Sequence, residues 1–300
     1  MVIASACAST PRVELAAGDQ ALVGRVQEAA PAVRAERIVS AASAAEPSAP
    51  TPTVAVDASE TTSGLLAGGV DPATLTTTPG GNYTIQATPE PLRDRRLPTF
   101  PRLPPPVDDG FAFTIGTLTG DPLYRSTWNE RCPVPTDGLR YVTVSFWGFD
   151  GLHHTGELIV AAEEADNIVA VFQQLHGIRF PIEEMRIVTP ADVVARRTGD
   201  GNNTASFVCR TVTGGSRFSE HAYGLAVDIN PFHNPYQRDD LVIPTLSSSY
   251  LDRTRTLPGM IVPGDPASDE VVAAFAAIGW SWGGNWSSLK DYQHFAKNNR

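Results

Sequence analysis

Hydrophobic and polar positions alternate in the middle of the chain with the period of β-strands. In residues 140–149, every second residue from Val142 to Phe146 is apolar, as in a strand with one buried face. Residues 156–160, Gly-Glu-Leu-Ile-Val, form an apolar run of strand length. A further short strand is expected at 185–190.

Two other segments repeat with the period of a helix. In residues 162–177, Ile168, Phe172 and Leu175 fall at i, i+4 and i+7, acidic residues come first and a glycine comes last. The same period predicts a helix at 269–280. Short strands mixed with separated helices predict an α+β domain, with a small and mainly antiparallel sheet flanked by helices.

Composition divides the chain into two parts. Residues 1–108 are rich in Ala, Thr, Ser and Pro, and their only aromatic residues are Tyr83 and Phe100. All five tryptophans lie at or after Trp128. A segment of such composition buries too little apolar surface to fold alone. We therefore expect residues 1–108 to be a disordered, low-complexity export or stalk region and residues 109–300 to be the folded domain.

The charge and the N-terminus bear on partners and location. The formal net charge is −10, which argues against nucleic acid as a partner, because a nucleic-acid-binding face is basic. The sequence has no apolar run of about 18 residues, so no transmembrane helix is expected. The stretch Ala-Ser-Ala-Cys, which ends at Cys7, resembles a bacterial lipoprotein cleavage site. Its two interpretations are a lipid anchor at Cys7 and a chance cysteine in a disordered N-terminus.

The other two cysteines are Cys132 and Cys209. Two cysteines in one domain suit a disulfide in an oxidising compartment. The alternative is two buried free thiols. Together with the export-like N-terminus, the disulfide predicts an extracytoplasmic protein, secreted or lipid-anchored at the cell envelope.

A carboxylate stands in the middle of an apolar strand candidate at residues 224–230, Gly-Leu-Ala-Val-Asp-Ile-Asn. Asp228 lies on the face opposite Val227 and Ile229. An ionised carboxylate is costly to bury unless an opposite charge meets it. The strand therefore predicts either a salt bridge or a bound cation at Asp228, and His221 precedes it closely enough to share that site.

Imidazole and carboxylate are both good zinc ligands, and a catalytic zinc site needs a third ligand and an open position. Histidine is the best candidate for the third ligand, and the remaining histidines are His153, His154, His176, His233 and His294. His294 lies in an aromatic stretch with Asp291 three residues before it, where a general base for a zinc-activated water would sit. Isolated histidines and aspartates are commonly structural, so spacing alone leaves the zinc site open.

The full set of motifs resembles a known family. Ser219-x-His221-x-x-Gly224-x-Ala226-x-Asp228, followed by Asp291-x-x-His294, resembles the zinc D-alanyl-D-alanine carboxypeptidases of the VanY type. It also resembles the L-alanyl-D-glutamate endopeptidases of phage endolysins and bacterial autolysins. The resemblance runs from about residue 130 to the C-terminus and includes FDGLHHTGELIV, FPIEEM, FVCR and GWSWGGNW. It implies that residues 109–300 are a Hedgehog/DD-peptidase-like zinc peptidase domain.

The resemblance also implies roles for individual residues. It implies three ligands for Zn²⁺, which are His221, Asp228 and His294. Asp291 takes the place of the catalytic carboxylate. Arg210 is the candidate for the arginine that stabilises the oxyanion or binds the substrate carboxylate, and Arg217 is the alternative. A disulfide at Cys209 would fix the backbone beside Arg210.

Other polar residues near the motifs are weaker candidates. Ser219, Tyr223 and His154 are candidates for contacting substrate, although each could equally be a packing residue. His233 and His176 are expected at the surface.

The function that follows is hydrolysis of peptidoglycan stem peptides by a monomeric zinc enzyme. The carboxypeptidase branch usually has glutamate where this chain has Asp291, so the resemblance leans toward the endopeptidase branch. One rival is a penicillin-binding serine enzyme, since Ser287-x-x-Lys290 matches its first motif, but the Lys-Thr-Gly motif is missing. The second rival is a zinc-binding, non-catalytic cell-wall-binding module of the same fold.

Overall fold

The computed structural model describes residues 84–194, 198–212 and 215–299. The predicted disorder before residue 84 and the predicted export or anchor signal at Cys7 lie outside the described residues. Within the described residues, the structure contains no helix with the length and apolar character that crossing a membrane requires.

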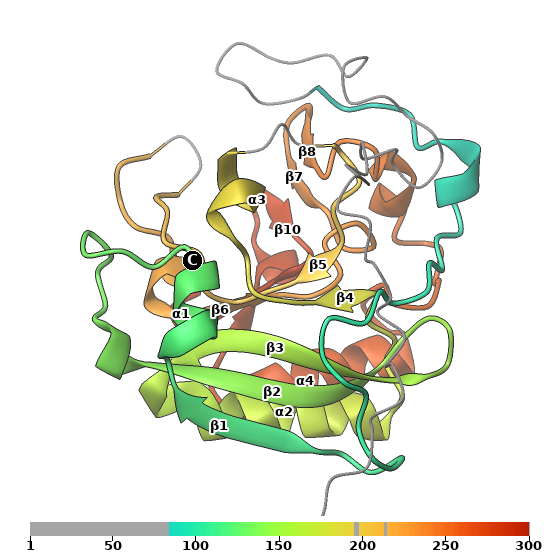
Figure 1. Cartoon of the computed structure of the whole chain (residues 1–300). Helices are drawn as coiled ribbons and strands as arrows, with labels where there is room; N and C mark the ends of the chain where they lie inside the picture. Colours follow the sequence, from blue (N-terminus) through green and yellow to red (C-terminus); the bar gives the residue numbers. More distant parts are fainter. Residues whose placement is uncertain (1–83, 195–197, 213–214, 300) are drawn as a thin grey trace, which may run out of the picture. The chain divides into compact units, whose positions relative to one another are not determined.

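The longest strands form one three-stranded antiparallel sheet in the order β1–β2–β3 (Figure 1). Its strands are β1 (Phe113–Thr117), β2 (Leu139–Trp147) and β3 (His153–Ala161). β2 and β3 pair along their whole length, from Leu139 opposite Ala161 to Trp147 opposite His153. The strands predicted at 140–149 and 156–160 are therefore confirmed, and they pair with each other.

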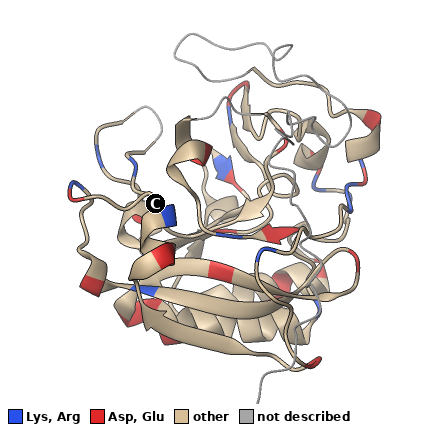
Figure 2. Cartoon of the chain, viewed as in Figure 1, with Lys and Arg blue, Asp and Glu red and all other residues tan. Residues whose placement is uncertain are grey.

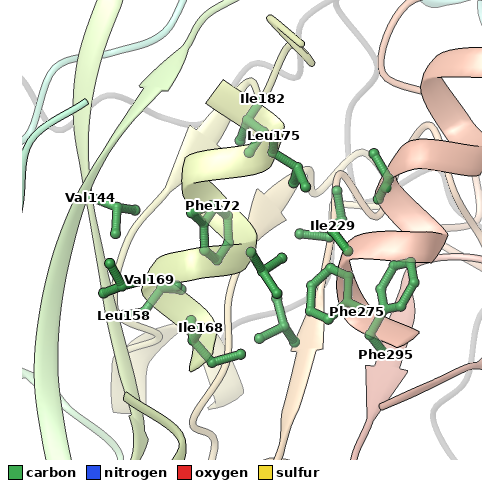
Figure 3. Packing of buried hydrophobic residues seen from close by; sticks show 14 of the residues in the cluster. Val144, Leu158, Ile168, Val169, Phe172, Leu175, Ile182, Ile229, Phe275 and Phe295 are labelled. Carbon is green, nitrogen blue, oxygen red and sulfur yellow. The ribbon is translucent and has the colours of Figure 1, made fainter. Parts of the chain in front are cut away.

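Two amphipathic helices supply most of the remaining core. They are α2 (Ala165–Gly177) and α4 (Pro266–Ala277). The apolar face of α2 packs against Val144 and Leu158 of the sheet on one side and toward Ile229 and Phe275 on the other (Figure 3). Helix α2 thus joins the large sheet to the elements that carry the candidate metal ligands, and both predicted helices are confirmed.

The remaining strands are short and form three small sheets. One has the antiparallel order β6–β11–β9, with β6 (Ala226–Asp228), β11 (His294–Ala296) and β9 (Ser281–Trp282). The second has the antiparallel order β10–β7–β8, with β10 (Lys290–Asp291), β7 (Tyr236–Arg238) and β8 (Leu241–Ile243). The third pairs β4 (Glu184–Met185) and β5 (Asn203–Thr204) in parallel. The short helices are α1 (Gly120–Arg125) and α3 (Pro190–Val194).

This arrangement confirms the α+β class with mainly antiparallel sheets. The strand predicted at 185–190 is largely wrong, because β4 ends at Met185 and helix α3 begins at Pro190. Its partner β5 offers only two residues for pairing. An apolar run of strand length therefore became mostly a connection between β4 and α3.

The proline-rich segment before residue 109 packs on the domain. Leu92 is buried in a cluster with Phe232 and Tyr250. The Arg95 guanidinium makes two hydrogen bonds to the Glu183 carboxylate, at 2.6 and 2.7 Å. The boundary at residue 109 stays a prediction, while these contacts, which composition did not predict, tie part of the segment to the folded domain.

Cys132 and Cys209 form a disulfide, as the sequence predicts. Both half-buried cysteines pack at the edge of a cluster that includes Leu139 and Phe207. The bond therefore attaches the chain immediately before Arg210 to the connection between α1 and β2.

Candidate metal centre and active site

His221, Asp228 and His294 converge on one point. One ligand atom from each lies within 4.8 Å of the others. The pairing of β6 with β11 places His294 directly opposite Asp228, and His294 Nδ1 lies 3.0 Å from Asp228 Oδ1. The backbone of Asp228 also exchanges hydrogen bonds with Ala205 on its other side. The aspartate is thus fixed between β11 on one side and the residue that follows β5 (Asn203–Thr204) on the other.

His221 is aimed by its own short helix, η5 (Glu220–Tyr223). The Ser219 hydroxyl accepts a hydrogen bond from the His221 backbone N–H, and His221 Nδ1 donates to the Ser206 carbonyl at 2.5 Å. That bond leaves Nε2 toward the cluster, 3.2 Å from Asp228 Oδ2. A backbone acceptor that fixes the ring of a histidine ligand is a usual feature of zinc sites.

Gly224 turns the chain from η5 into β6. Its φ is 68°, in the left-handed region that glycine adopts without strain. A Cβ atom there would lie 2.5 Å from the Ala161 backbone nitrogen. Glycine is therefore required both by the turn and by the close approach of β3, and it sets the spacing between His221 and Asp228.

The surroundings of Asp228 explain how a charged carboxylate is tolerated in an apolar strand. Burial alone would raise the pKa of Asp228, but the neighbouring His221 and His294 imidazoles hold that pKa far below its ordinary range. Two nitrogen donors and one carboxylate form the three-ligand set of a catalytic zinc centre, with room for an open position. The residues therefore fit a bound Zn²⁺.

Asp291 lies beside this cluster on β10. Its Oδ1 atom is buried and has no hydrogen-bond partner among the described residues. Burial, together with the Asp228 charge, raises the pKa of Asp291 to about 7 against the opposing effects of His294 and Arg210. A carboxylate with a pKa near neutrality can both accept and release a proton during a reaction.

The Trp-Gly-Gly motif supports Asp291 from behind. A Cβ atom on Gly283 would lie 2.6 Å from the Asp291 carbonyl oxygen, and one on Gly284 would lie 2.3 Å from the Trp282 ring. Gly283 is therefore needed for β10 to lie this close to the chain beneath it, and Gly284 is needed for the chain to pass the Trp282 ring. This close packing places the Asp291 side chain.

A cavity of about 1080 Å³ surrounds these groups. The residues that line it and that the sequence had singled out are Arg210, Arg217, Ser219, His221, Asp228, Asp291 and His294. Arg210 and Arg217 lie next to the antiparallel bridge between Thr211 and Phe218. Arg210 is half-buried, whereas Arg217 is exposed. The Arg210 charge acts on Asp291, which favours Arg210 over Arg217 as the arginine near the reacting atoms.

Two predicted substrate residues are not brought to this cavity. In the part of the chain that the structure describes, neither Tyr223 nor His154 lines it. His154 instead contacts the Asp150 carboxylate through Nε2 at 3.1 Å. Ser219 does line the cavity, but its hydroxyl caps the helix that carries His221.

The expectation that His233 is a surface residue is wrong. Its side chain is fully buried, and Nε2 donates to the Arg95 carbonyl at 3.0 Å. Asn202 donates to Nδ1 at 3.1 Å. Burial lowers the pKa of His233 to about 3. The Arg95 segment, distant in sequence, provides this partner, so local pattern could not reveal it. His176 is half-buried beside Trp147.

Several residues that line the cavity were not predicted as site residues. Tyr236 and Arg238 of β7 and Trp286 all do so, and the Trp286 ring lies 5.5 Å from the His294 ring. The only local signal was that Tyr236 follows the Asp228 motif closely. Its place in the cavity depends on the pairing of β7 with β10, which are more than fifty residues apart.

Two imidazoles and a carboxylate around an open cavity, with a second carboxylate beside them, define a metal-dependent hydrolase site. Residues 213–297 match the family described as D-alanyl-D-alanine carboxypeptidase. This match confirms, for that segment, the predicted resemblance to D-alanyl-D-alanine carboxypeptidases. The segment includes the three candidate ligands and Asp291. Arg210 and both disulfide cysteines lie before it. No curated protein and no solved structure matches the chain.

Proposed function

We propose that this protein is a zinc-dependent peptidoglycan peptidase that hydrolyses stem-peptide bonds. The proposal rests chiefly on one observation: the His-Asp-His cluster and a buried, unpartnered oxygen of Asp291, among the described residues, share one cavity. A site that only bound metal would not need the second carboxylate. The same observation disfavours the non-catalytic cell-wall-binding module.

His221, Asp228 and His294 would hold Zn²⁺, which when bound lowers the pKa of water and polarises a carbonyl group. Asp291 accepts a proton from the attacking water and passes it to the amine that leaves. Arg210 donates hydrogen bonds to the negative charge that develops on the carbonyl oxygen. The disulfide at Cys209 limits the movement of Arg210, because the two residues are adjacent.

Between the two stem-peptide bonds, we propose L-alanyl-D-glutamate cleavage first and D-alanyl-D-alanine cleavage second. The resemblance supports this order, because Asp291 stands where the carboxypeptidase branch usually has glutamate. The cavity, of about 1080 Å³, also offers room for residues on both sides of the scissile bond. Mass spectrometry of digested peptidoglycan separates the two, since the first exposes a D-glutamate or D-isoglutamine N-terminus and the second releases D-alanine.

We propose that the protein acts outside the cytoplasm, as a secreted or lipid-anchored monomer of the bacterial envelope. The disulfide supports this location, because such bonds persist in oxidising compartments. The substrate lies there as well. The lipid anchor at Cys7 and the stalk of residues 1–108 belong to the same proposal.

The test compares wild-type protein with Asp291→Ala and with Asp109→Ala, an exposed aspartate used as a matched control. We expect Asp291→Ala to keep one Zn²⁺ per chain and to lose about 10²–10⁴-fold in kcat, the usual contribution of a general base. Asp109→Ala should match wild type. If zinc-loaded wild type and Asp291→Ala both leave purified peptidoglycan intact, the binding-module alternative replaces the enzyme.

A further inference from the structure

The cavity carries arginines on a protein that is otherwise acidic. Its lining includes Arg186, Arg210, Arg217 and Arg238, whereas the whole chain has a formal net charge of −10. Figure 2 shows basic positions near β7 and β10, with acidic positions beside them and over much of the rest of the chain. The lining also holds the carboxylates of Asp192, Glu220, Asp228 and Asp291. An anionic ligand would therefore be attracted to an individual arginine whose charge is not already paired, rather than to the cavity as a whole.

These arginines differ in how they are paired. Arg186 is held by the Asp192 and Glu184 carboxylates, at 2.8 and 2.7 Å. The ion pair that the structure shows for Arg238 is much weaker, because Asp239 lies 4.0 Å away and its side chain is 93% exposed. Contacts between solvated charges at this distance contribute little. Arg238 thus keeps donor capacity for a ligand, whereas Arg186 is already committed to two acids.

Tyr236 lies two residues before Arg238 on β7, so both side chains project from the same face of the strand. Both residues also line the cavity. Tyr236 pairs directly with Asp291 of β10, which places this face of β7 next to the proposed general base. Burial raises the pKa of Tyr236, so its phenol stays protonated and can donate a hydrogen bond.

The Arg238 position is distinct from that of Arg210. Arg210 lies next to the bridge between Thr211 and Phe218, whereas Arg238 ends β7, which pairs with β8 and β10. A substrate held at the metal cluster could therefore contact arginines from two separate segments that line the same cavity. A planar guanidinium and a phenol O–H on one strand face form a donor set that suits a carboxylate.

We propose that Arg238, with Tyr236 beside it, binds one carboxylate group of the substrate. This contact would make the enzyme selective for peptides in which that carboxyl group is free rather than amidated. This inference rests on the proposed peptidase function and names a determinant of its specificity. Arg238 positions the peptide along the cavity and takes no part in proton transfer. Its removal should therefore raise KM and leave kcat nearly unchanged.

The experiment uses a synthetic pentapeptide, L-Ala-γ-D-Glu-L-Lys-D-Ala-D-Ala, in three forms. One has both carboxyl groups free, one is amidated at D-Glu and one is amidated at the C-terminus. For zinc-loaded wild type, we expect one amidation to lower kcat/KM by about tenfold, mostly through KM, as loss of a charge-assisted hydrogen bond does. Arg238→Gln should cleave the acid and amide forms of that position at equal rates.

Matched variants identify the cause. Arg96→Gln removes the same charge from a side chain that is 51% exposed, against 59% for Arg238, and should keep the wild-type preference. Arg238→Lys should keep part of it, because the charge remains while the fork geometry is lost. Tyr236→Phe, which removes only the hydroxyl, should weaken the preference by a smaller factor.

The outcomes separate this inference from the proposed function. If wild type cleaves all three peptides equally, or if Arg238→Gln keeps the wild-type preference, the inference is overturned while the peptidase function stands. If wild type cleaves none, the proposed function fails. Calorimetric binding of the same peptides then still tests Arg238, since Arg238→Gln should abolish the difference in Kd between acid and amide forms, and an unchanged difference overturns the inference.

Discussion

The β1–β2–β3 layer with α2 and the region that carries the metal ligands are held together in different ways. The sheet layer consists of strands of five to nine residues and a thirteen-residue helix, which share a buried apolar core. The ligand region consists of strands of two or three residues joined by turns. The strands of the ligand region bury Val227, Trp282 and Phe295 in the same core, but they are too short to fix the ligand geometry by strand pairing alone, and specific polar contacts complete it.

Buried asparagines show how the ligand region is held. Asn230, with a φ of 42°, donates from its side chain to the Pro181 carbonyl at 2.8 Å. Asn234 donates to the Gly259 carbonyl at 2.9 Å and accepts from the Ile261 N–H at 2.7 Å. Such side chains satisfy backbone groups that short strands leave unpaired. The candidate site therefore lies where the strands are shortest and where side-chain hydrogen bonds to the backbone supplement strand pairing.

The largest effect is expected from Asp228→Asn, which should change the ligand region and leave the sheet layer folded. The amide keeps the shape of the side chain but removes the charge that faces His221 and His294. We expect loss of stoichiometric zinc and a fall in activity of about 10³-fold or more, with the apo protein still folded. Zinc content and circular dichroism measure this. Retained zinc at wild-type affinity would contradict the assignment of Asp228 as a ligand.

In contrast, Phe275→Ala in the apolar core should lower the stability of the fold and leave zinc binding unchanged. Phe275 is fully buried and stacks on Phe295, with ring centroids 4.0 Å apart. The free energy of unfolding should fall by about 3–5 kcal/mol, while the molecules that remain folded keep their zinc. Urea denaturation at fixed zinc concentration checks this, with the half-buried Ile278→Ala as the milder control. A loss below about 1 kcal/mol would mean that this core tolerates a cavity.

A pH dependence of stability should arise from His233. Its pKa is about 3 in the folded protein and 6.5 ordinarily, so the unfolded chain binds more protons between these values. Stability is therefore present above pH 6.5 and is lost as the pH falls toward 3, by about 2 kcal/mol between pH 7 and pH 5.

The control for this prediction is His233→Gln, which cannot titrate. Other groups also titrate in this range, so the quantity to compare is the difference between the two pH profiles of unfolding free energy. That difference should shrink steadily as the pH falls from 7 to 5. Parallel profiles would show that His233 is not held neutral by burial.

The smallest effect is expected from Ser219→Ala. The Ser219 hydroxyl accepts from the His221 N–H, and loss of such a cap costs about 1 kcal/mol. Because the cap aims a ligand, zinc affinity should fall by about tenfold, which competition with a chelator measures. Ser219→Thr keeps the hydroxyl and should bind zinc like wild type. Equal affinity for all three proteins would leave the cap without a role in metal binding.

The sequence predicted the long strands and helices better than the pairing of the short strands in the ligand region. The pattern of apolar residues in the sequence located β2, β3, α2 and α4, because each of these elements is long enough to show such a pattern. The spacing of His221 and Asp228, and of Asp291 and His294, indicated the site through family resemblance. Hydrophobic pattern alone could not pair Tyr236 with Asp291, because that register depends on contacts between distant short strands.

Burial of single polar residues was also beyond local pattern. His233 has no apolar periodic neighbourhood that signals a core position, and its partner Arg95 comes from a segment that composition assigned to a stalk. His154 was predicted as a candidate for substrate contact, but its Nε2 atom contacts the carboxylate of Asp150, four residues earlier. In both cases the deciding partner is a particular side chain or carbonyl, which only the three-dimensional arrangement identifies.

The Cys132–Cys209 disulfide makes the intervening chain a closed covalent ring. A single proteolytic cut inside the ring leaves two pieces that stay linked, and they separate only when a reductant is added. The three candidate ligands, Asp291 and Arg210 all follow Cys209, so such a nick leaves the whole catalytic set on one piece. In the proposed location outside the cytoplasm, where proteases are present, this topology would offer a form of damage tolerance that the unlinked chain lacks.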